Sequence, residues 1–273
     1  MFNNTAHYSG KVRELYDEGD TLVIETTNRM SGFDRYLCDV PLKGDVLTQL
    51  SAWWFEKTKS IVPNHFIELI SKNKMRVKKC RVFPIEVVVR GYLTGSTNTS
   101  AWSLYEAGER VFFDTVLPDG LQKNTKLLNP IITPTSKSSV HDEPLMTQNI
   151  DQYISKDLWE KIKNIALDLF SFGQQIAQKK GLILVDTKYE FGLDENNNIC
   201  LIDECHTPDS SRFWKDNTTE HYDKEYLRLW YKKNCDPYHD KILPTIPEKI
   251  IQEMSTRYIY LFEKITGEKL KVT

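Results

Sequence analysis

Cysteine is scarce in this chain and is not arranged in pairs. Five cysteines occur in 273 residues, and no two of them stand in a C-x-x-C arrangement. An odd number of cysteines without such spacing argues against a disulfide scaffold and against a zinc knuckle. We therefore expect reduced thiols and a cytoplasmic protein. The five are Cys38, Cys80, Cys200, Cys205 and Cys235.

Long apolar runs and an excess of one charge are also missing. No apolar run approaches the length of a membrane span, and the segment MFNNTAHYSGKVRE (1–14) lacks the apolar stretch of a secretory signal. The formal net charge is −2, so no general basic field would attract nucleic acid or an anionic membrane. We expect neither partner, and any bound phosphate must be held by a local group of side chains.

The composition is that of an ordinary soluble globular protein, with 40% hydrophobic and 27% charged residues. A chain of this length forms one large domain or two smaller ones with room for a cleft. Segments 21–27 and 84–93 are rich in β-branched residues and predict strands. Between them, 47–62 has apolar residues at helical spacing, and its Trp53 and Trp54 are expected in the core.

The middle of the chain, 94–148, is rich in turn-forming residues and predicts a loop by its composition. A loop of this length in a compact domain is usually functional or disordered, and its run TPTSK (133–137) supplies hydroxyls and a cation. Apolar spacing predicts a helix over 155–182 and two more near 222–233 and 247–266.

The segment LVDTKYEFGL (184–193) raises the central question of this sequence. Side chains alternate between the two faces of a strand, so Asp186, Lys188 and Glu190 share one face although apolar residues lead into it. The turn composition of 194–198 predicts an antiparallel hairpin with a second strand, which brings Asp203 close to this face.

Three carboxylates and one lysine on a partly buried face repel one another in part and lose hydration. A divalent cation would relieve this cost. Mg²⁺ is typically held by one or two carboxylates together with the phosphate oxygens of a substrate. The alternative interpretation is the ordinary solvated face of an antiparallel sheet.

Two further clusters could bind phosphate or carboxylate. In DECHTPDSSRFW (203–214), a turn with Asp209 leads to Arg212, whose guanidinium can make bidentate contacts with an anion. In EVVVRGYLTGS (86–96), Arg90 ends a run of valines and Ser96 lies in the turn that follows. The alternative for the first is a turn capped by its own Asp and Ser with Arg212 on the surface, and for the second an arginine at the end of a strand.

Other signals are weaker. YSGKVRELYD (8–17) places a glycine before Lys11, but it is not a Walker A loop, and the sequence has no G-x-G-x-x-G. SGFDR (31–35) is a second polar turn. His141 and His206 have no metal-ligand spacing, and we expect both to be structural or peripheral to a site.

Taken in order, these stretches resemble the SAICAR synthetase family, the phosphoribosylaminoimidazole-succinocarboxamide synthases of purine biosynthesis. The resemblance runs from about Gly10 to Trp230 and rests most on the last two of its motifs. The motifs are GKVRELYD, SGFDR, PIEVVVRGYLTGS, ITPTSK, HDEP, LVDTKYEFG and DECHTPDSSRFW.

The resemblance implies an α+β fold of two lobes, with an antiparallel N-terminal lobe similar to the small lobe of kinases. We accordingly expect an ATP-binding lobe over 1–86, a substrate- and metal-binding lobe over 87–273 that ends in packing helices, and ATP in the cleft between them. The implied activity is that of a ligase that uses ATP and Mg²⁺ to join L-aspartate to the carboxylate of CAIR, a carboxylated aminoimidazole ribonucleotide. The products are SAICAR, ADP and phosphate, formed through an acyl phosphate.

The resemblance also implies roles for individual residues. The nucleotide is expected at Gly10, Lys11, Arg13, Arg81 and Glu86, and CAIR at Arg90, Ser96, Asp209 and Arg212. Glu190 and Asp203 are expected to bind Mg²⁺, and Lys188, Asp186 and Lys11 to act in catalysis. No role is implied within 112–132 or for 135–137, and the aspartate site is not located.

The residues alone leave two other interpretations open. A kinase-like phosphotransferase acting on a small alcohol would share the Gly-Lys loop and the metal carboxylates, but would need a general base and no aspartate. A catalytically silent nucleotide-binding module would tolerate the loss of one metal carboxylate, whereas both Glu190 and Asp203 are present. The sequence is equally compatible with a monomer and a homodimer.

Overall fold

The computed structural model describes residues 8–137 and 144–272 of the chain. Within these residues the fold is mixed α+β, and ten of the strands form two five-stranded antiparallel sheets. The first sheet, in the order β1-β2-β3-β7-β6, comprises Tyr8–Ser9, Arg13–Asp17, Thr21–Thr26, Lys74–Lys78 and Phe66–Ser71. The second, in the order β11-β8-β12-β13 with β14 also paired to β12, comprises Thr125–Ser136, Arg81–Leu93, Leu182–Leu193, Ile199–Ile202 and Ser211–Lys215.

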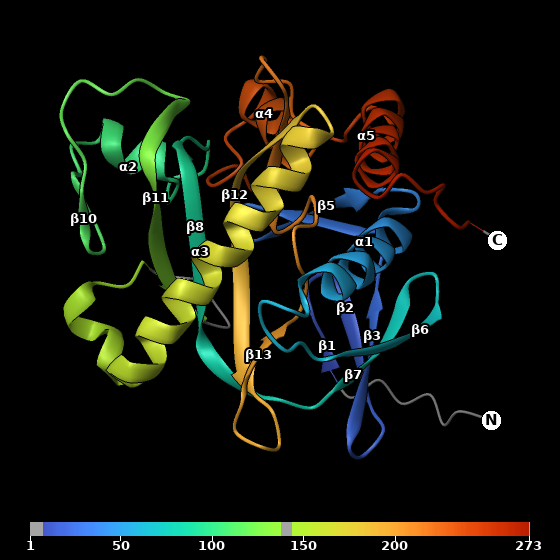
Figure 1. Ribbon diagram of the computed structural model, residues 1–273. Coiled ribbons are helices and arrows are strands. Elements are labelled where there is room, and N and C mark those ends of the chain that lie inside the picture. Colours follow the sequence, from blue (N-terminus) through green and yellow to red (C-terminus); the bar gives the residue numbers. More distant parts are fainter. Residues whose placement is uncertain (1–7, 138–143, 273) are drawn as a thin grey trace.

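Four long helices pack against these sheets and against each other (Figure 1). α1, Lys43–Thr58, contacts β3, β6 and β7 of the first sheet and also α5, Glu248–Thr266. α3, Lys156–Lys179, lies along β12 and β8 of the second sheet, and α4, Glu225–Asn234, contacts α5. The helices predicted from apolar spacing are thus confirmed, with ends that differ by a few residues. Trp54 is fully buried in the core, as expected, and Trp53 packs at its edge.

The segment 94–148 is not a loop, and the prediction from its composition was wrong. Its described part contains β11, the helix α2 (Ala101–Glu106), the strands β9 (Val111–Phe112) and β10 (Thr115–Val116), and the 3-10 helix η1 (Thr147–Gln152). β11 accommodates Pro130 and Pro134 because it is an edge strand, and its pairing with β8 is shifted between Lys126 and Ile131. The high content of turn-forming residues therefore led to a wrong prediction of secondary structure for this segment.

β12 changes the face that it turns toward the core along its length. Leu182 and Leu184 belong to the main hydrophobic core, and so do Tyr189 and Phe191, which have the opposite parity in the sequence. The change coincides with a shift in the pairing to β14 between Leu184 and Asp186. Such a bulge re-aims the side chains that follow it. Beyond it, the even-numbered polar residues of β12 point away from the core.

The expected hairpin is confirmed. β12 and β13 are antiparallel, and Glu190 lies opposite Ile202, so that Asp203 directly follows the residue facing Glu190. The chain leaves the first sheet at Lys78 and enters the second at Arg81, which places the expected lobe boundary at 86/87 inside the continuous strand β8. The division into lobes at that position stays a prediction.

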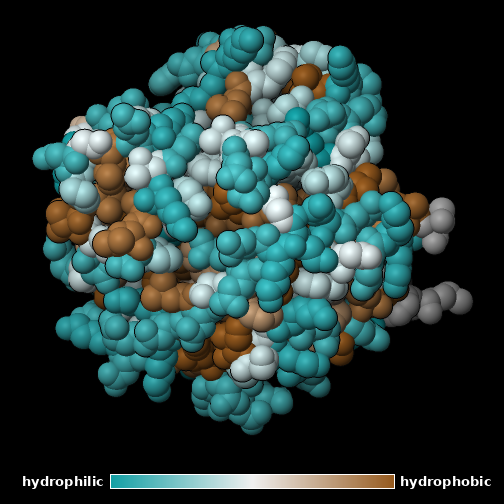
Figure 2. All heavy atoms as spheres, turned by 45° about the horizontal axis from the view of Figure 1, so that its top comes forward, coloured by the Kyte–Doolittle hydropathy of each residue, from teal (hydrophilic) through white to brown (hydrophobic). Residues whose placement is uncertain are grey.

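The hairpin β4 (Arg29–Gly32) and β5 (Arg35–Asp39) contains the SGFDR turn. No helix in the described part of the chain has both the length and the apolar character that a membrane span requires. The face of the molecule in Figure 2 is largely hydrophilic, and the hydrophobic residues on it form several separate patches.

Candidate active site

A cleft of about 590 Å³ is lined by residues from both sheets. Its volume lies within the usual range for small-molecule sites. Its walls come from the loop before β2, the β4–β5 turn, strands β8, β11 and β12, the loop 203–211 and the start of α4. Eleven of the residues with roles implied by the resemblance line this cleft: Gly10, Lys11, Arg13, Glu86, Arg90, Asp186, Lys188, Glu190, Asp203, Asp209 and Arg212.

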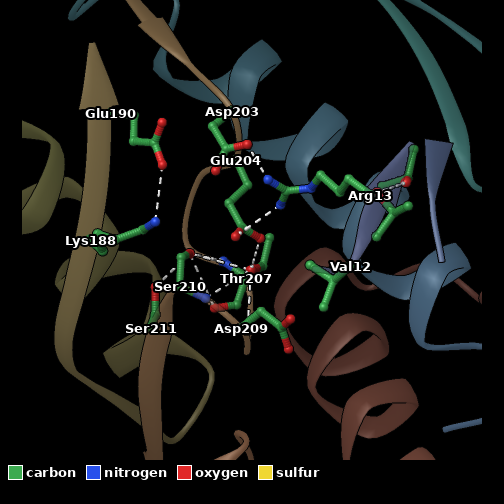
Figure 3. Close-up of polar contacts among 12 residues, drawn as sticks. Val12, Arg13, Lys188, Glu190, Asp203, Glu204, Thr207, Asp209, Ser210 and Ser211 are labelled. Carbon is green, nitrogen blue, oxygen red and sulfur yellow. Dashed lines mark hydrogen bonds and ion pairs between the residues drawn. The ribbon is translucent and has the colours of Figure 1, made fainter. Parts of the chain in front are cut away.

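Arg13 joins the first sheet to the loop after β13. Its guanidinium forms an ion pair with Asp203, and its Nη2 atom lies 2.9 Å from Oε1 of Glu204 (Figure 3). Burial alone would lower the pKa of Arg13, but the charges of Asp203 and Glu204 outweigh it and raise this pKa above its ordinary value. Burial likewise favours a protonated Asp203, yet Arg13 and Lys188 outweigh it and hold the pKa of Asp203 below its ordinary range. Both groups are therefore charged at neutral pH.

The backbone at Asp203 is also unusual. Its φ angle is 68°, in the left-handed region that residues with side chains rarely adopt. Such conformations persist where surrounding contacts hold them in place, and they are frequent at functional sites. Here the contacts are the ion pair with Arg13 and the β12–β13 ladder that ends at Ile202.

Lys188 lies between two carboxylates on the polar face of β12. Its ammonium is 2.6 Å from Oε1 of Glu86 and 3.0 Å from Oε1 of Glu190, and Lys137 pairs with the other oxygen of Glu190. Burial alone would lower the pKa of Lys188, but Glu190 and Glu86 outweigh it and hold the pKa well above its ordinary value. Lys188 is thus a cation fixed in the cleft, and Lys137 of the TPTSK run joins the same cluster.

A second charged cluster surrounds Asp186. Nη1 of Arg212 donates a hydrogen bond to Oδ2 of Asp186 over 2.6 Å, and Nη1 of Arg90 lies 3.6 Å from the same oxygen. Arg212 also pairs with Glu225 at 3.4 Å. Burial lowers the pKa of Arg90 to about 10, despite the opposing charge of Asp186, and nearby Arg212 lowers it further. Asp186, at 3.6 Å, compensates the positive charge of Arg90 only in part, so a bound anion would stabilise this charge.

Asp209 is held by residues far away in the sequence. Its Oδ2 lies 2.9 Å from the ammonium of Lys43, which is fully buried at the start of α1, and Oδ1 accepts a 2.7 Å hydrogen bond from the hydroxyl of Tyr258. Burial raises the pKa of Asp209, but Lys43 and Lys224 outweigh it, so that this pKa lies below its ordinary range. The pair fixes the turn that leads to Arg212.

The loop before β2 lies at the open side of the cleft. Lys11 pairs with Asp34 of the SGFDR turn at 2.8 Å, and both side chains are about half exposed, at 55% and 44%. Arg29 donates hydrogen bonds to the backbone carbonyls of Gly10 and Lys11 and thereby holds the loop. Lys11 is consequently an accessible cation at the mouth of the cleft, whereas Arg13 is largely buried.

Arg81 and Ser96 do not line the cleft, although the resemblance implied roles for both. The guanidinium of Arg81 donates a 3.4 Å hydrogen bond to Oδ1 of Asn197, in the β12–β13 turn. Ser96 is buried, and its backbone carbonyl accepts a hydrogen bond from Lys232. Their assignments stay predictions.

Sequence reasoning missed several residues of the cleft. Glu204 is buried beside Arg13, and only its position next to Asp203 could have suggested it. Lys224 and Arg228 also line the cleft, and burial lowers the pKa of Lys224 to about 8, although Asp209 opposes this shift. No motif marks these two, since the fold alone brings the start of α4 to the cleft.

His206 is structural, as expected. It is fully buried, its ring contacts Trp54, and its Nε2 atom lies 2.5 Å from the hydroxyl of Tyr189. Burial lowers the pKa of His206 to about 3, so the ring is neutral. His141 lies outside the described residues, as do all but the last residue of the HDEP motif.

The charged residues fit a Mg²⁺ ion only in company with phosphate. Within 8–137 and 144–272, no group of three or more His, Cys, Asp or Glu side chains is arranged to hold a metal alone. Glu190 and Asp203 both line the cleft, and the negative charge of each raises the pKa of Arg13. At phosphate-binding sites, Mg²⁺ is usually held by one or two protein carboxylates together with phosphate oxygens of the substrate. The donor set therefore suits a metal–nucleotide complex.

Comparison with known proteins points in one direction. A family model described as SAICAR synthetase matches residues 6–245 of the chain. A phosphoribosylaminoimidazole-succinocarboxamide synthase of Legionella pneumophila is 50% identical, over 96% of this chain and 88% of its own length. A chloroplastic enzyme of the same name from Arabidopsis thaliana is 48% identical, over 96% of this chain and 67% of its own length.

Solved structures agree with the sequence comparison. A SAICAR synthase from Saccharomyces cerevisiae, complexed with SAICAR, is 31% identical with a TM-score of 0.84, covering 98% of this chain and 96% of that one. A SAICAR synthetase in complex with ADP is 30% identical with a TM-score of 0.75, covering 97% and 99%. The mixed α+β fold with antiparallel sheets is thus that of both structures.

Proposed function

The chain belongs to the SAICAR synthetase family, and we propose that the cleft lined by both sheets is where it joins L-aspartate to CAIR with ATP. One observation carries this placement. Two charged clusters, around Lys188 and around Asp186, lie next to each other on β12 and line one cleft. A site for transfer of a phosphoryl group between two anionic substrates needs this proximity.

The reaction has to activate a carboxylate. Transfer of the γ-phosphoryl group of ATP to the CAIR carboxylate produces an acyl phosphate, which has a good leaving group. The amine of aspartate then attacks the acyl carbon, the C–O bond to phosphate breaks, and the nitrogen loses a proton. Phosphoryl transfer depends mainly on positioning and on neutralising charge, so no covalent enzyme nucleophile is needed.

We assign the nucleotide to the side of the cleft formed by the first sheet and the start of β8. Lys11 is accessible there, and Arg13 is fixed by Asp203 and Glu204, so both can neutralise phosphate oxygens. The segment Arg81–Glu86 lies where the chain passes from one sheet to the other, which supports contact with the adenosine. The residues assigned to the nucleotide remain Gly10, Lys11, Arg13, Arg81 and Glu86.

We assign Mg²⁺ to Glu190 and Asp203. When bound, the ion would neutralise phosphate charge. In the structure Lys137 and Lys188 pair with Glu190, and Arg13 pairs with Asp203. These pairs hold both carboxylates in position, and the cations can turn toward phosphate oxygens when the nucleotide binds.

CAIR belongs, on this proposal, at the Asp186 cluster. Arg90 and Arg212 would bind its phosphate or carboxylate, and Asp209 holds the turn from which Arg212 projects. Ser96 completes the expected set, although it does not line the cleft. Lys188 lies between Asp186 and Glu190 along β12, so it would place a fixed positive charge near the phosphoryl group during its transfer. Asp186 and Lys11 are the other catalytic candidates.

Other parts of the prediction remain proposals. The division into an ATP-binding lobe at 1–86 and a substrate lobe at 87–273 is supported by the change of sheet near Arg81. A cytoplasmic location is supported by five cysteines that are all unpaired.

The proposal is tested by measuring ADP release with ATP and Mg²⁺ while CAIR and L-aspartate are added separately and together. Release of ADP coupled to SAICAR formation only when both are present is the expected result. Turnover with a small alcohol in place of both substrates would instead favour a kinase. Equal activity of Lys188→Met and wild type would show that the reaction takes place elsewhere in the protein.

A further inference from the structure

Two cysteines from distant parts of the chain meet away from the cleft. Cys80 lies in the two-residue linker between β7, which ends at Lys78, and β8, which begins at Arg81. Cys200 lies in β13. Neither lines the cleft, and the proposed reaction uses neither. Their proximity therefore calls for a separate explanation.

The geometry places both thiols on one face of the β12–β13 hairpin. Gly192 of β12 is paired directly with Cys200. A Cβ atom built on Gly192 would lie 3.1 Å from Cβ of Cys80 and 2.9 Å from the carbonyl oxygen of Arg81, so the linker crosses β12 in close contact. Directly opposed residues in an antiparallel pair have Cβ atoms on the same face, about 4.5–5.5 Å apart. Cys80 and Cys200 accordingly lie beside each other above Gly192.

The two thiols also interact. Interaction with the thiol of Cys200 lowers the pKa of Cys80, although burial opposes the shift. Lys78 lowers the pKa of Cys80 further, and Asp194 raises it. Cys200 is buried, whereas Cys80 is partly exposed. A partly exposed thiol with a lowered pKa, next to a second thiol, is the usual arrangement of a redox-sensitive pair.

We propose that Cys80 and Cys200 are a modification site at which peroxide forms a reversible intramolecular disulfide. The thiolate of Cys80 attacks one oxygen of hydrogen peroxide, the O–O bond breaks, and a sulfenic acid and hydroxide result. The sulfur of Cys200 then attacks the sulfur of Cys80, the S–O bond breaks, and water leaves with the thiol proton. Two thiols are oxidised to one disulfide while one peroxide is reduced to two waters.

The bond would tie the linker between the sheets to β13. That strand ends at Ile202, directly before Asp203, and the linker leads directly into Arg81–Glu86. The disulfide would thus restrain the two backbone segments that enter the proposed nucleotide side of the cleft. It would also close a long loop of chain, and such cross-links stabilise a fold by restricting the unfolded state.

The test uses the full-length reduced protein, treated with hydrogen peroxide under native conditions, alkylated, digested and examined by mass spectrometry. We expect one cross-linked pair of peptides, containing Cys80 and Cys200, together with the loss of two of the five titratable thiols. Dithiothreitol should restore both. Cys235→Ser, a change at a partly exposed cysteine at the end of α4, should behave as wild type. Cys80→Ser and Cys200→Ser should lose the cross-link.

A thermal measurement gives a second readout. Peroxide should raise the unfolding midpoint of wild type and of Cys235→Ser by several degrees, and dithiothreitol should reverse the rise, whereas Cys200→Ser should show none. The proposal would be overturned if wild type kept all its thiols after treatment. It would also be overturned by a disulfide that involves another cysteine or that joins two chains. None of these outcomes depends on catalytic activity.

Discussion

Replacing Arg212 by alanine should weaken the binding of CAIR far more than the binding of ATP. Arg212 is largely buried, at 12% side-chain exposure, and contacts Asp186 at 2.6 Å and Glu225 at 3.4 Å. Without it, the nearest cation with a recorded ion pair to Asp186 within the described residues is Arg90, at 3.6 Å. The cluster would then keep only one of the two guanidinium groups beside Asp186, which weakens its attraction for an anionic substrate.

The size of the effect follows from these contacts. Loss of one hydrogen bond between a buried charged donor and an anion costs roughly 2–3 kcal/mol. Because each 1.4 kcal/mol corresponds to a factor of ten, KM for CAIR should rise about 30- to 150-fold. KM for ATP should change less than about threefold, since Arg212 lies in the Asp186 cluster and not beside Arg13.

Initial rates of ADP release, measured against CAIR and against ATP at saturating levels of the other substrates, separate the two constants. Arg212→Lys should recover part of the loss, because lysine keeps the charge but not the planar fork. Arg110→Ala is the matched control, since Arg110 pairs with Asp119 on the surface outside the cleft. An equal rise in both KM values, in a variant with a normal unfolding midpoint, would refute the assignment of Arg212 to CAIR.

Three further predictions concern ionisation and burial. Burial lowers the pKa of Lys224 to about 8, so this side chain loses its positive charge as the pH rises through 8. The affinity of wild type for CAIR or aspartate should fall over this pH range. Lys224→Met should bind these substrates weakly at every pH, without this pH dependence. Burial lowers the pKa of His206 to about 3, so the folded protein keeps this ring neutral while the unfolded chain takes up a proton below pH 6.5. The free energy of unfolding should therefore fall as the pH falls, by about 2 kcal/mol at pH 5. Urea unfolding of His206→Gln should show a smaller decrease in this free energy over the same pH range. Lys43→Met removes the ion-pair partner of buried Asp209 and should cost roughly 3–5 kcal/mol of stability in the same assay; a value below 1 kcal/mol would show that Tyr258 and Lys224 suffice.

The β12–β13 hairpin shows what local pattern can predict. Alternation of side chains placed Asp186, Lys188 and Glu190 on one face, and turn composition placed Asp203 beside them, because both rules act over a few residues. The bulge before Asp186, which turns this face away from the core, has no signature in the sequence. Sequence therefore identified the polar face without explaining how the strand presents it.

Contacts between distant segments could not be predicted. Lys43 and Asp209, or Arg13 and Glu204, meet only because α1 and β2 pack against the loop after β13. A buried lysine at the start of a helix carries no local signal of its partner. β11 was missed for a different reason, since its prolines are acceptable only at the edge of a sheet, and edge position is a property of the whole fold.

The assignment on which the proposed mechanism depends most is that of Mg²⁺ at the ATP phosphates to Glu190 and Asp203. The most direct measurement is kcat for ADP release against Mg²⁺ concentration in wild type, Glu190→Gln and Asp203→Asn, with Glu195→Gln on the exposed turn of the same hairpin as control. Both site variants should keep a normal circular dichroism spectrum, lose at least about 100-fold in kcat and require more Mg²⁺, because each removes a carboxylate that the metal needs. The control should match wild type. Near-wild-type kcat at low Mg²⁺ in both site variants would contradict the account.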